Sequence, residues 1–122
     1  MKSESVAAER LILDLDVIRE LEKLKLDDGA GLLPTLVELF HESVHDIEIL
    51  QEHFQHGDLD GVRALAHNLK SNAANLGLIR LKCICHKIEI AKTADDMRLS
   101  VSLLQEEFAL ASLHLGSLNA KT

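Results

Sequence analysis

The sequence predicts an all-α fold, an antiparallel four-helix bundle with one or two short N-terminal helices covering one end. The chain has 122 residues, enough for one hydrophobic core and too few for two domains. Six glycines and one proline supply few of the breakers that tight β-turns need, whereas helix formers are abundant. Apolar residues recur at three- and four-residue steps in four long segments, which is the helical period.

The first long segment predicts one helix of about 25 residues. It begins near Pro34, which fits the first turn of a helix, and it ends at His56-Gly57. Its apolar stripe consists of Leu33, Val37, Phe40, Val44, Ile47 and Phe54. Upstream, a shorter helix that starts at Leu15 carries apolar residues as far as Leu24, and we expect it to cover one end of the bundle.

The same spacing predicts three further helices. Asp58 suits the N-cap of the second helix, which Gly77 ends. The third helix runs over residues 78–91, and Asp95 or Asp96 then caps the fourth. Short connections between long helices favour antiparallel neighbours, which is why these segments predict a bundle.

We expect a single domain over residues 1–122, with its core at about residues 15–116. Gly116 is expected to close the fourth helix, and residues 1–5 and 117–122 to be frayed. We also expect the chain to be a monomer.

Composition favours a cytoplasmic protein without direct membrane contact. No apolar run approaches the ~20 residues of a membrane span, and acidic residues interrupt the N-terminus where a signal peptide needs an apolar stretch. Cys83 and Cys85 are two residues apart, so they project from different sides of a helix and cannot pair. We expect both to be buried small hydrophobes, and no second thiol pair completes a zinc site.

The formal net charge of −7 is unevenly distributed. Residues 63–92 carry six Lys and Arg against the single acid Glu89, a net charge of +5, whereas residues 26–62 carry nine acids and no Lys or Arg. Six bases over thirty residues are too sparse for duplex DNA, so we expect no nucleic-acid partner. The basic segment is suited instead to an anion or to an acidic protein surface.

His67 stands out on the predicted second helix. It lies more than 90° from the apolar stripe, so we expect an exposed imidazole. Arg63 and Lys70, one turn away on either side, are cationic, while Ser71 and Ala74 are small. A neutral ring nitrogen can attack phosphorus while cations offset the charge on the phosphoryl oxygens. The pattern therefore suits a phosphoryl group, although a surface histidine that happens to lie beside two bases is the simpler reading of the helix alone.

The string AHNLKSNAANLG at residues 66–77 closely resembles the signature of histidine-containing phosphotransfer (HPt) domains. In that family the phosphoacceptor His is followed by Lys at the third position, by Gly or Ser at the fourth and by Gly at the tenth. His67, Lys70, Ser71 and Gly77 occupy these places. The resemblance extends over roughly residues 15–115 and implies a four-helix bundle of the HPt type.

The resemblance implies that His67 accepts a phosphoryl group from the aspartyl phosphate of one receiver domain and passes it to the Asp of another. Lys70 would neutralise phosphoryl oxygens, Gly77 would leave room near the imidazole, and Ser71 is a common variation at its position. The family often carries a polar side chain on the third helix that holds the ring. Lys82, His86 and Glu89 are the candidates here.

The implied partners are response regulator receiver domains and a hybrid sensor kinase, so the chain could also be a domain of a membrane-bound kinase. The surface that would meet the acidic receiver pocket consists of Arg63, Lys70, Ala74, Arg80 and Lys82. Magnesium belongs to the receiver in such relays, so no cofactor is expected in this chain. The sequence has neither a Walker-type loop nor the boxes of a kinase ATP lid, so we expect no ATP-dependent kinase activity of its own.

Two other functions remain open from the residues. Glu38 with His41, and Glu42 with His45, have the Glu-x-x-His spacing of di-iron bundles, which would make a metal-binding oxidoreductase. Such sites need the motif on two helices, and both copies lie on one. We therefore expect a solvated polar face and no metal. The third reading is an adaptor bundle that is never phosphorylated.

Overall fold

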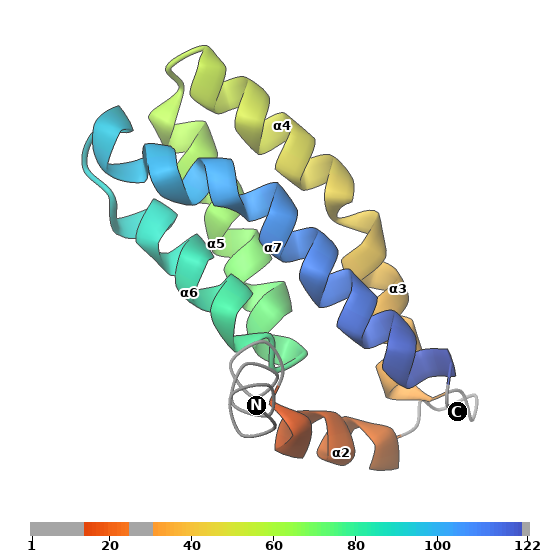
Figure 1. Ribbon diagram of the computed structural model, residues 1–122. Helices are drawn as coiled ribbons and strands as arrows, with labels where there is room; N and C mark the ends of the chain where they lie inside the picture. Colours follow the sequence, from red (N-terminus) through yellow and green to blue (C-terminus); the bar gives the residue numbers. More distant parts are fainter. Residues whose placement is uncertain (1–13, 25–30, 121–122) are drawn as a thin grey trace, which may run out of the picture.

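The structure is a computed structural model that describes residues 14–24 and 31–120, with side chains through Gly116. Its regular elements, over the described part, are helices arranged as an elongated bundle (Figure 1). They are α2 (Leu15–Lys23), α3 (Leu32–Glu42), α4 (Val44–Gln55), α5 (Leu59–Asn75), α6 (Ile79–Ile90) and α7 (Ala94–Ala120). In Figure 1, α3 and α4 together form one arm of the bundle, α5, α6 and α7 form the others, and α2 crosses one end. The all-α bundle predicted from the sequence is confirmed.

The first arm differs from the prediction, because the single helix expected there is split at Ser43. The Ser43 backbone N–H donates to the carbonyl oxygen of Phe40 over 3.0 Å, three residues back instead of four. Its hydroxyl donates to the same oxygen over 2.5 Å. A serine that competes for a backbone carbonyl in this way locally tightens or bends a helix. The core face survives the break, since Phe40 and Ile47 are both buried.

Helix α5 begins and ends as the sequence predicts. Asp58 is its N-cap, and Oδ1 accepts the backbone N–H of Gly61 over 3.0 Å. At the other end Gly77 has a φ of +69°, the left-handed conformation that glycine adopts without a steric penalty. The N–H of Leu78 then reaches back to the carbonyl of Ala73 over 2.8 Å, which satisfies an open carbonyl of the last turn.

Helix α7 departs from its predicted bounds at both ends. Thr93 caps it, because Oγ1 accepts the N–H of Asp96 over 3.2 Å, whereas Asp95 and Asp96 lie in the first turn. The helix also continues through Gly116 to Ala120. A glycine ends a helix when it adopts a positive φ, and among the described residues only Gly57 and Gly77 do so. The prediction that Gly116 closes this helix is therefore wrong.

The predicted N-terminal cover is present as α2. Asp14 is its N-cap, accepting the N–H of Asp16 on Oδ1 over 3.0 Å, and Ile18 is buried against the bundle. A second short helix nearer the N-terminus, and the frayed ends expected at 1–5 and 121–122, lie outside the described residues.

The core is aliphatic, as the near absence of aromatic residues requires. Its one stacked aromatic pair in the described region joins Phe40 of α3 to Phe108 of α7, with ring centroids 4.4 Å apart. Buried apolar residues line the inner face of every arm, among them Leu50, Val62, Leu69, Leu81, Ile88, Met97 and Leu104. Within the described ranges no helix has the length and apolar character needed to span a bilayer.

Candidate functional site

His67 lies on the outer face of α5, and 58% of its side chain is exposed, as the helical spacing predicts. The adjacent residue Ala66 and the nearby Leu69 point the other way and are buried. The packing of α5 against its neighbours thus fixes the backbone beneath His67 while leaving the imidazole accessible to another molecule.

Glu89 of α6 holds the imidazole. Nδ1 of His67 and Oε1 of Glu89 are 2.6 Å apart, which is a hydrogen bond between residues that lie 22 positions apart in the chain. Since α5 and α6 pack side by side, the contact depends on the register between the two helices. Of the three ring-holding candidates, Lys82, His86 and Glu89, the structure brings Glu89 to the ring. Nε2 makes no hydrogen bond to any described residue.

Lys70 meets the same carboxylate. Its ammonium donates to Oε2 of Glu89, and both side chains are about three-quarters buried, with 23% and 25% exposed. The hydrogen bond from Lys70, and after it the one from His67, hold the pKa of the Glu89 carboxyl below its ordinary value. Glu89 is therefore an ionised acceptor shared by the ring and the ammonium. The role expected of Lys70, neutralising phosphoryl oxygens, stays a prediction.

Arg63 is also engaged elsewhere. Nε donates to the carbonyl of Ala91 over 3.0 Å and Nη2 to that of Lys92 over 3.2 Å, so the guanidinium caps the C-terminal end of α6. Its remaining nitrogen Nη1 bonds to Asp60 over 3.0 Å. The sequence places Arg63 on the face of His67, but its donors serve the joint between α6 and α7.

Arg80 lies away from the site. It is nine residues from Glu89, which turns it to the opposite side of α6, and Nη2 donates to Glu107 of α7. Lys82 does share the side of Glu89 and is exposed, but seven residues place it about 10 Å along the helix. The predicted basic surface is therefore split, with Arg80 on another face.

The two small residues beside His67 are where the helix predicts them. Ala74 is exposed on the same side of α5, two turns on. Ser71 is exposed, and its hydroxyl donates to the backbone carbonyl of His67 over 3.2 Å. Neither side chain covers the imidazole, so a partner can approach along this face.

Gly77 does not lie beside the imidazole. Ten residues separate it from His67, about 15 Å along α5. A Cβ on Gly77 would come within 3.0 Å of Cβ of Asp14 and of Cβ of Val17. The space that the glycine leaves is thus occupied by α2, and the expected room for the ring is not its function.

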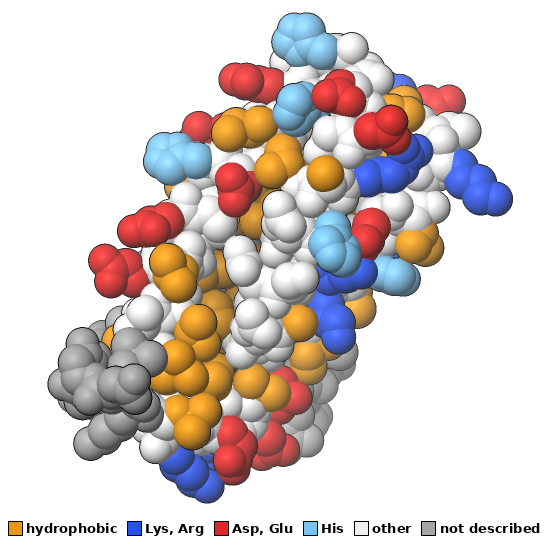
Figure 2. Space-filling view, turned by 180° about the vertical axis from the view of Figure 1, so that it is seen from behind, with side chains coloured by type: hydrophobic (Ala, Val, Ile, Leu, Met, Phe, Trp, Pro, Cys, Tyr) orange, Lys and Arg blue, Asp and Glu red, His pale blue; other side chains and the backbone are white. Residues whose placement is uncertain are grey.

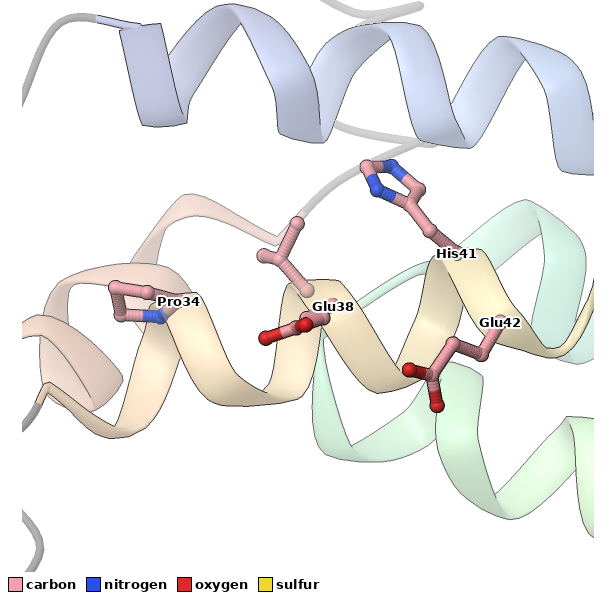
Figure 3. A pocket seen from close by; sticks show the side chains of 5 residues that line it. Pro34, Glu38, His41 and Glu42 are labelled. Atoms are coloured by element: carbon pink, nitrogen blue, oxygen red, sulfur yellow. The ribbon is translucent and has the colours of Figure 1, made fainter.

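The di-iron hypothesis finds no support. No group of three or more His, Cys, Asp or Glu side chains capable of holding a metal is present in the described residues. Glu38, His41 and Glu42 line an open hollow on α3, where Figure 3 shows the His41 ring and the Glu42 carboxylate turned apart. His45 instead faces Glu48 at 3.8 Å on the exposed side of α4. These four side chains are exposed and form the solvated polar face that the sequence predicts.

An apolar hollow beside α5 escaped the sequence analysis. It lies between α3 and α5, and Leu39 at its rim is 55% exposed. Its lining residues are Leu36, Leu39, Phe40, Asn72, Asn75 and Leu76. Figure 2 shows an uncharged strip on this face, with hydrophobic side chains on one side and a group of His, Lys, Arg and acidic side chains on the other. Leu39 lies outside the apolar stripe of its helix, and a leucine at such a position was the signal in the sequence that could have indicated this hollow.

The two cysteines differ in environment. Cys85 is buried as predicted, whereas Cys83 is exposed, because α6 turns it outward. Burial, and to a lesser degree the nearby carboxylate of Glu89, raise the pKa of the Cys85 thiol to about 12. Cys85 is thus a neutral packing residue under the site.

Comparison with protein families shows which family the chain belongs to. The family model described as Hpt domain matches residues 35–118, which cover α4 to α6 entirely and most of α3 and α7. No curated protein and no solved structure gave a match. The family model covers most of the length of the chain, and the exposed His67 on α5 agrees with it. The chain therefore belongs to the Hpt domain family, whose members carry phosphoryl groups in two-component signalling.

Proposed function

We propose that His67 is the phosphoacceptor of this carrier, taking a phosphoryl group from the aspartyl phosphate of one receiver and giving it to the Asp of a second. The observation that carries the proposal is the hydrogen bond between Nδ1 of His67 and Glu89. An ionised carboxylate can only accept, so Nδ1 carries a proton, and in the neutral imidazole Nε2 then keeps its lone pair. The exposed nitrogen is then the nucleophile.

The transfer follows from this tautomer. Nε2 attacks phosphorus as the N–P bond forms and the acyl O–P bond breaks, and the bonding pair leaves with the carboxylate of the donor receiver. The Nδ1 proton stays on the ring against Glu89. The return step, to the Asp of the second receiver, reverses these bonds. Lys70, which shares the Glu89 carboxylate with His67, would offset charge on the phosphoryl oxygens once the group is in place.

The docking face that fits this role is the exposed side of α5 around His67. The apolar hollow with Leu39 flanks it toward α3, and Lys70 and Lys82 flank it toward α6. Because Arg63 and Arg80 are bonded within the bundle, we expect apolar contact to contribute more than the basic rim. Any magnesium would be supplied by the receiver, and the chain itself needs no cofactor.

The upstream partner in this proposal is a hybrid sensor kinase in the cytoplasm, and the chain acts as a monomer. The second candidate is an adaptor bundle that is never phosphorylated. Such a bundle does not require a carboxylate that orients an exposed imidazole. The contact with Glu89 therefore favours the carrier.

A two-step relay assay tests the proposal. The chain is incubated with phosphorylated receivers from a panel, its mass is measured, and a second unphosphorylated receiver is then added. We expect the chain to gain one phosphoryl group and to lose it to the second receiver. A chain that takes up nothing from any receiver, or that keeps the group permanently, would contradict the carrier role.

A further inference from the structure

Helix α7 carries a second apolar stripe on the side that faces away from the core. Its inner stripe is buried in the bundle and consists of Met97, Val101, Leu104, Phe108, Ala111 and Leu115. The outer stripe consists of Leu99, Leu103, Leu110 and Leu113. Leu99 and Leu113 are both 69% exposed and Leu103 is 37% exposed, whereas Leu110 is half-buried. Packing of the core therefore does not account for the outer stripe.

The outer stripe has the spacing of a helix that packs against another helix. With Glu106 included, its positions follow one another at steps of four, three, four and three residues, which is the heptad period of paired helices. The stripe is about 21 Å long. Figure 1 shows α7 along the front of the bundle between α4 and α6, with no other described helix over it. A single exposed leucine needs no explanation, but a row at this period is typical of a surface that binds a further helix.

An acid lies at the middle of the outer stripe. Glu106 is exposed, seven residues after Leu99 and seven before Leu113. Among the described residues it forms no ion pair, whereas the adjacent Glu107 is bound to Arg80 of α6. A helix with heptad spacing that covers the stripe in either direction places its middle residue opposite Glu106. Since burying an unpaired carboxylate is costly, the middle residue of that helix should be a cation.

A second copy of this chain does not meet that requirement. Two antiparallel copies related by a two-fold axis would place Leu99 of one copy opposite Leu113 of the other. The axis would then pass beside Glu106, so that two carboxylates face each other. Parallel copies pair each residue with its equivalent and create the same conflict. Like charges that face each other across an interface disfavour it, so the charge of Glu106 selects a different partner.

We propose that the outer stripe of α7 is a docking site for an amphipathic helix of a partner protein, with apolar residues at heptad spacing and a Lys or Arg at its middle position. The leucines supply the apolar contact, and the ion pair with Glu106 sets which helix binds and in which register. This site goes beyond the carrier role proposed above and does not depend on it.

One end of the outer stripe adds a second requirement. Leu99 lines an open hollow between the end of α6 and the start of α7, together with Ile90, which is 62% exposed. Lys87 and Lys92 border the same hollow, against the single acid Asp96. The end of the partner helix that lies over this hollow should therefore carry an acid beside its apolar residues.

The docking site on α7 and the exposed His67 lie on opposite sides of the bundle. Helix α5 packs against α4 and α6, and α7 packs against α3, α4 and α6, so α5 and α7 are diagonal to each other. In Figure 1, α5 lies behind α7. A helix bound to the outer stripe thus leaves the imidazole accessible. A partner could hold this chain through α7 while receivers meet it at His67.

Two synthetic helical peptides of about 20 residues serve as probes, since this length covers the stripe. Both have leucines at heptad spacing and a glutamate near one end, and they differ only in an arginine or a glutamate at the middle position. Fluorescence anisotropy measures their binding to the intact chain. We expect wild type to bind the arginine peptide about tenfold more tightly than the glutamate peptide. Phosphoryl uptake from a receiver should be the same with and without the arginine peptide.

Two charge variants test the assignment to Glu106. Glu106→Arg should reverse the preference and bind the glutamate peptide more tightly. Gln105→Arg is the matched control, because Gln105 is also exposed but the helix turns it about 100° from its neighbour. It should keep the wild-type preference.

Three results would overturn the inference. The first is a wild-type chain that binds neither peptide or binds both equally, which is decisive even if a variant does not fold. The second is a folded Glu106→Arg chain that keeps the wild-type preference. The third is self-association of wild type in sedimentation that is lost in Leu99→Asp, because it would assign the stripe to a second copy. None of these results bears on the carrier role, and a chain that takes up no phosphoryl group would overturn that role without affecting peptide binding.

Discussion

The backbone N–H of Asp14 donates to the carbonyl oxygen of Gly77 over 2.7 Å. This bond fixes the start of α2 to the end of α5, the helix that carries His67. The positive φ of Gly77 turns its carbonyl and its open side toward α2. The signature glycine thus forms part of the contact between α2 and the end of α5.

Gly77→Ala should therefore destabilise the protein through two effects. A φ of +69° strains any residue with a Cβ, and that Cβ would lie 3.0 Å from Asp14 and Val17. We expect the free energy of unfolding, measured by urea denaturation, to fall by about 2–3 kcal/mol. Gly57→Ala is the control, with a φ of +77° and nothing within 4 Å, and should cost only about 1 kcal/mol. Equal losses would show that α2 does not pack against this position.

Gly116→Ala should instead raise the free energy of unfolding. Gly116 lies inside α7 without a positive φ, and a Cβ there meets nothing within 4 Å. Because alanine is favoured over glycine in a helix interior, we expect stability to rise by about 0.5–1 kcal/mol. A loss of stability in the same urea titration would mean that the helix ends at Gly116 after all.

The affinity for a receiver should fall more on removal of the Leu39 side chain than on an increase in ionic strength. Removing most of an exposed apolar side chain beside the docking face is expected to weaken binding by about tenfold in Leu39→Ala. Leu113→Ala is the matched control, since Leu113 of α7 is also exposed and lines no part of the hollow. Calorimetry at low and high salt checks both points. Equal affinities for the two variants, or a steep loss with salt, would assign docking to the basic rim instead.

The contribution of Cys85 to the free energy of unfolding should decrease at alkaline pH. Its thiol has a raised pKa of about 12 in the fold, compared with an ordinary value of 9.0. The unfolded chain therefore loses this proton first as the pH rises, and the contribution of Cys85 to stability declines from about pH 9 upward. Below that range both states hold the proton and the contribution is constant.

Alkylation provides the direct readout for the two cysteines. In the native protein near neutral pH, iodoacetamide should modify the exposed Cys83 and leave Cys85 intact, whereas in urea both should react. Peptide mass mapping distinguishes the two sites. Native labelling of Cys85 at the rate of Cys83 would contradict the buried, neutral thiol.

The helical periodicity of the sequence was sufficient to predict the helices and to predict that the His67 side chain is exposed. Each arm carries apolar residues at the helical spacing, and that pattern depends only on neighbours within the same helix. The break at Ser43 was not predictable in this way, because a serine inside a helix is compatible with the pattern whether or not it bonds to a carbonyl. The end of α7 was misjudged because glycine stops a helix only when it turns to positive φ.

Contacts between helices could not be derived from the sequence. Glu89 was one of three candidates for holding the ring, and choosing among them required the register of α6 against α5. The same is true of Arg63 and Arg80, which look available in the sequence and are bonded to other helices or their ends. Charge along a chain shows which residues are basic, but packing decides which of them remain open to a partner.

His67 is expected to be the single phosphoacceptor of the chain, and two histidine variants show whether it is. Wild type, His67→Gln and His86→Gln are incubated with a phosphorylated receiver, and their masses and circular dichroism are measured. His86 is the control, an exposed histidine on α6 that makes no hydrogen bond to the His67 ring. We expect wild type and His86→Gln to gain one acid-labile, alkali-stable phosphoryl group, and His67→Gln to gain none with unchanged helicity. Phosphorylation that persists in His67→Gln would show that another residue accepts the phosphoryl group.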